Sequence, residues 1–181
     1  MASGTLLGIN GSLRAGSYNR KLMREAARIY DPAQFVEADL QLPLYDGDLE
    51  NAGGIPVPVQ RLADQIAAAD AVVISGPEYN KGLSGVLKNA LDWVSRTKGG
   101  PWRDKPVAVM AATGGRAGGE RTQWTLRLCL IPFRPRLVAG PEVLVGSCAE
   151  QFDSDGRLVN DRYLTALTEL MAELRKEVGR G

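Results

Sequence analysis

The chain has 181 residues, of which 44% are hydrophobic and 24% charged, and its 22 lysines and arginines against 21 aspartates and glutamates leave a formal net charge of +1. This composition is typical of about one globular domain, which excludes disordered, collagen-like and coiled-coil chains, and the balanced charge argues against a nucleic-acid partner. The sequence contains no histidine, which excludes serine–histidine and cysteine–histidine catalytic pairs and metal sites built on histidine.

From residue 5 onward, short apolar segments alternate with helical patterns. Residues 5–9 predict a strand, residues 19–30 a helix, and residues 35–39 a second, weaker strand. A second helix is indicated around Leu62 and Ile66, and the segment 42–58 before it holds several glycines and prolines. Because this segment is long for a connection, we expect it to form a lip beside a functional site.

The second half of the chain continues the alternation. Residues 71–75 predict a strand, and the helix after it repeats apolar residues in steps of three and four, at Leu83, Val86, Leu87, Ala90, Leu91 and Val94. A strand at 107–112, a helix at about 120–130, a strand at 137–145 that is broken at Gly140-Pro141, and a helix at about 161–178 complete the pattern.

Continuous apolar runs are typical of strands buried on both faces, and the alternation of strands with helices implies a parallel sheet between two helical layers. We therefore expect a single domain over residues 1–181, an α/β three-layer sandwich with a five-stranded parallel sheet in the order 2-1-3-4-5.

Two further features bear on location. Cys129 and Cys148 are too few for a disulfide framework and are interpreted as small buried hydrophobic side chains. No apolar run approaches the roughly 18 residues of a membrane span, and the N-terminal segment does not show the pattern of a signal peptide. We expect a cytoplasmic protein with no membrane partner.

In a sheet of this order, ligands bind beyond the carboxyl ends of the strands, where the strand order reverses. The loops after the first, third and fourth strands converge there, and they are residues 10–19, 76–81 and 113–119. All three are rich in glycine, hydroxyl or asparagine residues. Their convergence predicts a ligand site.

The first of these loops nearly matches a nucleotide-binding P-loop. Gly11 and Gly16 have the right separation, but Ser17-Tyr18 stands where a lysine and a hydroxyl residue are required, so a magnesium nucleoside triphosphate is not expected. Polar groups at a helix N-terminus suit a phosphate monoester, and here they are Ser12, Arg14, Ser17 and Asn19. The alternative is an ordinary turn in which Ser17 or Asn19 caps the helix and Arg14 is solvated.

The other two loops suit a flat heterocycle. An aromatic ring and an amide offer a face and hydrogen bonds, and the second loop supplies them within Pro77, Glu78, Tyr79 and Asn80. The alternative is a proline-initiated turn. In the third loop, glycines let the backbone approach a ligand closely, within Thr113, Gly114, Gly115 and Arg116. The alternative is a flexible linker, with Arg116 a surface charge.

Two segments resemble the signatures of the NADPH-dependent FMN reductase family, which includes quinone, chromate and azo-dye reductases. Gly11-Ser12-Leu13-Arg14 with Ser17 and Asn19 resembles its phosphate loop, GSLRxxSxN. The stretch from Pro77 to Trp93 resembles its second signature, PEYNxGxSxxLKNAxDW, through Gly82, Ser84, Lys88, Asn89 and Asp92. The resemblance covers residues 6–119.

The resemblance implies a flavodoxin-like fold, FMN as cofactor, NADPH as hydride donor and a small-molecule electron acceptor such as a flavin or a quinone. It implies that Ser12, Arg14, Ser17 and Asn19 hold the FMN phosphate. Pro77, Glu78, Tyr79 and Asn80 would flank the isoalloxazine ring, and Thr113, Gly114 and Gly115 would close over its pyrimidine side. Arg116 could steer the phosphates of the donor, while Lys88 and Trp93 are expected to have surface and packing roles.

Members of this family are usually oligomeric, so we expect a homodimer or homotetramer, with Leu44, Tyr45 and Ile55 available for contact. Two other classes remain open on the same fold. A flavodoxin-type electron carrier would usually present a strongly acidic face, which a net charge of +1 does not favour. A non-catalytic flavin- or nucleotide-binding module is the second.

Overall fold

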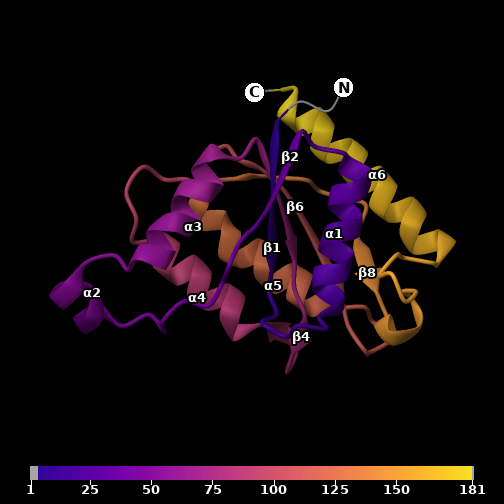
Figure 1. Cartoon of the computed structure of the whole chain (residues 1–181), viewed down its shortest axis with the longest axis horizontal. Helices are drawn as coiled ribbons and strands as arrows, with labels where there is room; N and C mark the ends of the chain where they lie inside the picture. Colours follow the sequence, from indigo (N-terminus) through magenta and orange to yellow (C-terminus); the bar gives the residue numbers. More distant parts are fainter. Residues whose placement is uncertain (1–3, 181) are drawn as a thin grey trace.

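The computed structural model describes residues 4–180, which form a parallel sheet between two layers of helices (Figure 1). The sheet order is β2 (Gln34–Glu37), β1 (Thr5–Asn10), β3 (Ala71–Ser75) and β6 (Pro106–Ala112), and β6 pairs on its other side with β7 (Arg136–Leu137) and β8 (Val143–Val145). All of these pairs are parallel. The predicted order 2-1-3-4-5 is confirmed.

The fifth position of the sheet is shared by two short strands. Pro106 aligns with Arg136 of β7, and Met110 aligns with Val143 of β8. Between the two strands the chain passes through Gly140-Pro141, where proline has no N–H to donate to a neighbouring strand. The break predicted at this dipeptide is therefore confirmed.

Each face of the sheet carries its own apolar core. Side chains alternate along a strand, so Leu6 and Val73 point to one face, while Leu7 and Ile74 point to the other. The first face is covered by α1 (Tyr18–Tyr30) and α6 (Asp161–Val178), and the second by α3 (Val57–Ala68), α4 (Gly85–Val94) and α5 (Glu120–Leu130).

The structure adds a helix and a hairpin to the predicted set, besides two short 3₁₀ helices, Ile131–Phe133 and Cys148–Glu150. A short helix, α2 (Gly47–Gly53), lies inside the segment 42–58 and buries none of its residues. A two-stranded hairpin, β4 (Glu78–Tyr79) and β5 (Gly82–Leu83), precedes α4. Leu83 was expected on the helix but lies in β5, because the hydroxyl of Ser84 caps α4 by accepting a hydrogen bond from Leu87 N.

Within residues 4–180, no helix is both long enough and apolar enough to cross a membrane.

Candidate functional site

The three predicted loops meet at the carboxyl ends of the strands and enclose a pocket of about 120 Å³. Nine of the twelve predicted site residues line it: Ser12, Arg14, Ser17, Asn19, Pro77, Glu78, Tyr79, Thr113 and Gly114. Asn80, Gly115 and Arg116 lie on the same loops but not on the wall of the pocket, whereas Tyr18, Ala112 and Cys148 complete it.

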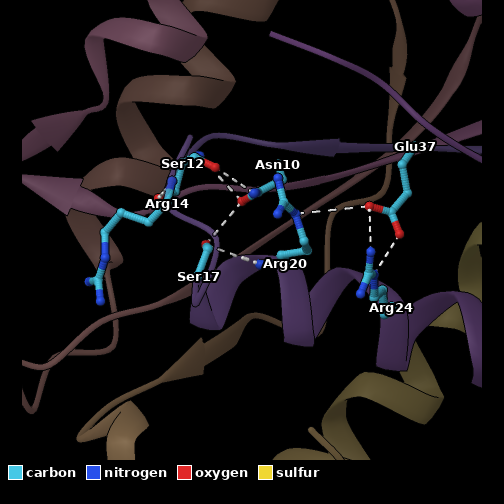
Figure 2. Close-up of polar contacts among 7 residues, drawn as sticks. All are labelled: Asn10, Ser12, Arg14, Ser17, Arg20, Arg24 and Glu37. Carbon is cyan, nitrogen blue, oxygen red and sulfur yellow. Dashed lines mark hydrogen bonds and ion pairs between the residues drawn. The ribbon is translucent and has the colours of Figure 1, made fainter. Parts of the chain in front are cut away.

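The first loop is held in shape by Asn10, the buried last residue of β1 (Figure 2). Its amide Nδ2 donates to the carbonyl of Ser12 at 2.6 Å, and its Oδ1 accepts from Ser12 N at 3.2 Å and from the hydroxyl of Ser17 at 3.3 Å. Ser17 Oγ in turn accepts from Arg20 N and caps α1. The capping alternative for Ser17 is therefore correct, and the same hydroxyl also lines the pocket.

Sequence reasoning did not single out Asn10. The signal for it was a polar residue that directly ends an otherwise apolar strand, because a buried side-chain amide needs several partners.

The mouth of the first loop carries Ser12 and Arg14. The hydroxyl of Ser12 is buried and accepts from Arg14 N at 3.4 Å, while the exposed Arg14 side chain extends away from the Asn10 cluster (Figure 2). Gly11 lets the loop pack on α4, because a Cβ there would come within 2.5 Å of Leu87 Cδ1. The pocket thus has hydroxyls at its base and a guanidinium at its rim.

Asn19 has a structural role that the sequence did not reveal. The ladder between β3 and β6 ends where Gly76 N donates to the carbonyl of Met110. Beyond this point, Asn19 takes the place of a strand partner for the backbone groups of Ala112. Its Nδ2 donates to Ala112 O at 2.8 Å, and its Oδ1 accepts from Ala112 N at 2.9 Å. Oδ1 also accepts from the hydroxyl of Ser75 at 2.9 Å. This carboxamide replaces a strand residue and ties α1 to two strands.

The second loop is a hairpin and not a simple proline turn. Its two turn residues, Asn80 and Lys81, have φ values of 49° and 67°, as a type I′ turn requires. The hairpin is held against α5, since Glu78 Oε2 accepts from Arg121 N at 3.1 Å and Glu78 Oε1 pairs with the Arg121 guanidinium at 3.5 Å. Tyr79 is half exposed at the edge of the pocket.

The third loop is held by hydrogen bonds to β8 and to the segment after it, which argues against the flexible-linker alternative. Thr113 N donates to Val145 O, and Cys148 N donates to Thr113 O. Gly118 has a φ of 65°, and a Cβ there would lie 2.3 Å from Leu144 O, so glycine is required. Around Gly114, by contrast, a Cβ would meet no atom within 4 Å. The backbone is therefore open to a ligand at this point.

Cys148 forms part of the pocket wall. Burial raises the pKa of this thiol, and the nearby Arg14 guanidinium opposes the shift to a smaller extent. The thiol is therefore neutral at physiological pH. Within residues 4–180, no group of three or more cysteine, aspartate or glutamate side chains is placed to hold a metal ion.

The second sequence signature also fixes the expected lip, residues 42–58, which contributes no residue to the wall of the pocket. Asn89 Nδ2 and Trp93 Nε1 both donate to the carbonyl of Pro43, at 2.9 and 2.8 Å, and Asn89 Oδ1 accepts from Tyr45 N. Trp93 is fully buried, whereas Lys88 forms a surface ion pair. Trp93 therefore has the packing role expected for it, and Lys88 has the expected surface role.

A doubly wound sheet with a hydroxyl-lined loop after its first strand, facing an aromatic hairpin, defines a protein of the flavodoxin-like class. The family model of the NADPH-dependent FMN reductases matches residues 5–150, and the chain belongs to this family.

Named relatives agree with this assignment. An NAD(P)H-dependent FMN reductase of Pseudomonas aeruginosa is 41% identical over 177 residues, which cover 97% of this chain and 95% of that protein. A quinone reductase of Escherichia coli is 38% identical over 162 residues, with coverages of 87% and 86%. The structure of a flavoenzyme NAD(P)H:(acceptor) oxidoreductase of Paracoccus denitrificans superposes with a TM-score of 0.87 at 30% identity, covering 98% of each chain. The chain is an FMN-dependent NAD(P)H oxidoreductase that passes electrons to a small acceptor.

Proposed function

We propose that the pocket formed by the three loops binds FMN through the residues that its sequence signatures indicate. The supporting observation is the joint arrangement of Ser12, Ser17 and Arg14, two buried hydroxyls and a free-standing guanidinium at the N-terminus of α1. These groups match the needs of a phosphate monoester, which prefers hydroxyl and N–H donors at the positive end of a helix.

The other residues fit the remainder of the cofactor. A volume of about 120 Å³ is well below the roughly 300–1,000 Å³ of pockets that enclose a whole drug-sized ligand. We therefore expect the pocket to enclose the phosphate end. The half-exposed Tyr79 and the open backbone at Gly114 would flank the ring, with Asn80 and Gly115 contributing backbone from the loop tips and Arg116 steering the donor.

Asn19 contributes to this site by position. Because its carboxamide is already bonded to Ala112 and Ser75, we propose that it holds the first turn of α1 in place. Ser12 and Arg14 would make direct phosphate contacts, and Ser17 would do so by turning its hydroxyl away from the 3.3 Å hydrogen bond to Asn10.

When bound, FMN supplies the redox chemistry, taking a hydride from NADPH and delivering electrons to the acceptor. The chain orients the reactants. The Glu78 carboxylate is engaged by Arg121 and positions the hairpin, and Cys148 stays a neutral thiol. With no histidine in the chain, we expect the rate of flavin reduction to vary little between about pH 6 and 8.

For the acceptor we propose a quinone or a free flavin. Support comes from the relatives named quinone reductase and FMN reductase, and from the exposed position of Tyr79, which leaves a flat acceptor room to approach.

A direct experiment uses purified protein reconstituted with FMN. Anaerobic addition of NADPH should bleach the yellow colour, and a quinone should restore it. A protein that retains no FMN at micromolar concentration would refute the proposed pocket, and retention without bleaching would refute the proposed donor.

We also propose a homodimer or homotetramer that forms through the outer face of α5. Trp124, Leu128 and Ile131 follow one another at helical spacing, and each is more than 60% exposed. Arg121 of the same helix holds the hairpin beside the pocket, so a second copy on this face would extend over the open side of the site. The lip is less suited to this role, since Tyr45 already packs edge-on against Trp93.

Light scattering tests the interface. Trp124→Glu should yield a monomer, while Leu44→Glu, at a lip residue that is 81% exposed, should keep the native mass. A monomeric wild type would refute the oligomer, and dissociation by Leu44→Glu alone would move the interface to the lip.

We propose further that residues 1–181 form one domain around a single sheet. We also propose that the protein works in the cytoplasm, which supplies reduced nicotinamide and suits its two free cysteines.

A further inference from the structure

A second pocket adjoins the FMN site on the outer side of α1. It measures about 220 Å³ and lies between the first two turns of α1 and the segment 154–157. Ser17 lines both pockets, so a group bound in the second would be a neighbour of the phosphate in the first. The charged residues that line the second pocket are mostly cations: Arg20, Lys21, Arg24 and Arg157, with the carboxylates Glu25 and Asp155.

The carboxylates around this pocket are already shared. Glu37 at the end of β2 accepts two hydrogen bonds from Arg24, at 2.5 and 3.2 Å, and lies 3.9 Å from Arg20 Nε (Figure 2). Glu25 is 3% exposed and pairs with Arg28 at 2.7 Å and with Arg157 at 3.3 Å. Two carboxylates therefore serve four arginines.

Two cations are left incompletely compensated. Arg20 Nε is buried and makes no hydrogen bond to any residue from 4 to 180. Lys21 forms no ion pair within the same range; its ammonium lies 5.4 Å from the centre of the Tyr18 ring, and its stem packs on Gly156. The pocket wall itself carries four cations, Arg20, Lys21, Arg24 and Arg157, against two carboxylates, Glu25 and Asp155. This leaves a surplus of two positive charges beside the positive end of α1.

This surplus matches a phosphate monoester, which carries about −1.5 to −2 charges at pH 7. The pyrophosphate that NADPH and NADH share carries a similar total charge, so the comparison of NADP⁺ with NAD⁺ binding decides between the two groups. NADPH differs from NADH by one such monoester, on the 2′ position of its adenosine. Resting on the proposed function, we propose that the second pocket binds the 2′-phosphate of NADPH, and that Arg20 and Lys21 set the preference for NADPH over NADH.

The test compares Lys21→Ala and the double variant Arg20→Ala/Lys21→Ala with wild type. Alanine favours the helix at both positions, and both side chains lie outside the FMN pocket. Calorimetric titration of the FMN-loaded protein with NADP⁺ and with NAD⁺ measures binding without turnover. We expect NADP⁺ affinity to fall about tenfold in the single variant and about a hundredfold in the double variant, with NAD⁺ affinity and FMN retention unchanged. The KM for NADPH should rise in parallel.

Two controls sharpen the result. Lys176→Ala removes the same charge from a surface ion pair on α6 and should change neither titration. Arg116→Ala tests the other candidate for steering the donor. Equal losses for NADP⁺ and NAD⁺, an unchanged preference in the double variant, or a preference that follows Arg116 would overturn the proposal. Bleaching of the flavin by NADH is measured in the same samples. A failure of the proposed function would therefore appear separately, as a wild type whose flavin neither NADH nor NADPH bleaches.

Discussion

Replacing Asn19 by alanine should destabilise the protein before any cofactor is considered. The carboxamide satisfies both backbone groups of Ala112, which is 2% exposed, and accepts the Ser75 hydroxyl. A buried polar group that loses its partner costs about 1–3 kcal/mol. Two orphaned backbone groups and a weakened hydroxyl, partly relieved by water entering the vacated space, give an expected loss of about 3 kcal/mol. This is a large share of a total stability of about 5–15 kcal/mol.

Urea unfolding of the cofactor-free protein measures the effect. With a slope of about 1–3 kcal/mol per molar urea, the midpoint should fall by about 1–3 M while the slope stays constant. Ser75→Ala is the matched control, because it removes one of the three hydrogen bonds and leaves Ala112 satisfied, and it should cost about 1 kcal/mol. A loss below 1 kcal/mol in Asn19→Ala, together with a sharp loss of FMN affinity, would refute the strand-replacement argument and make Asn19 a direct phosphate ligand.

Arg14→Ala should weaken FMN binding by about ten- to a hundredfold in a fluorescence titration, because charge-assisted contacts are worth about 1.5–3 kcal/mol. The unfolding midpoint should not change, since the Arg14 side chain is exposed. Unchanged FMN affinity would remove Arg14 from the site. Glu78→Gln should keep most of the rate of flavin reduction in stopped-flow, because its carboxylate positions the hairpin, and a loss beyond about a thousandfold would reveal a proton-transfer role. The raised pKa of Cys148 means that the folded state holds the thiol proton to higher pH than the unfolded state does. Its contribution to stability is therefore complete below the ordinary thiol pKa and is lost as the pH rises through the folded value. Wild type should accordingly lose more stability than Cys148→Ser as the pH rises above the ordinary thiol pKa, and parallel curves would contradict this.

The strands were predictable because burial on both faces leaves a strong local pattern. The continuous apolar run at 71–75 has the same bounds as β3, and the dipeptide Gly140-Pro141 marked the split of the last strand. The pattern failed where burial is weak. The helix α2 buries none of its residues, so it has no apolar periodicity, and β4 and β5 have two residues each, too few to show alternation.

The site was predictable at the level of loops and less so at the level of atoms. Parallel topology requires the three loops to meet, and nine of the predicted residues do line one pocket. The use made of each side chain depends on partners far away in sequence. Asn19 bonds a residue 93 positions later, and Thr122 donates to Pro77 O across 45 positions. Neither contact can be predicted from the spacing of nearby residues in the sequence.

The pocket lies between elements that pack in two different apolar cores. The first loop leads into α1, which is anchored in the core shared with α6, although its Gly11 also packs on α4. The hairpin leans on α5, which is anchored in the core shared with α3 and α4. The backbone of the sheet separates these two cores, so repacking on one side should add independently to repacking on the other. A ligand that touches both the loop and the hairpin would join the two halves. Its arrival should therefore slow amide hydrogen exchange on both faces of the sheet together, and make the unfolding of one half depend on the other.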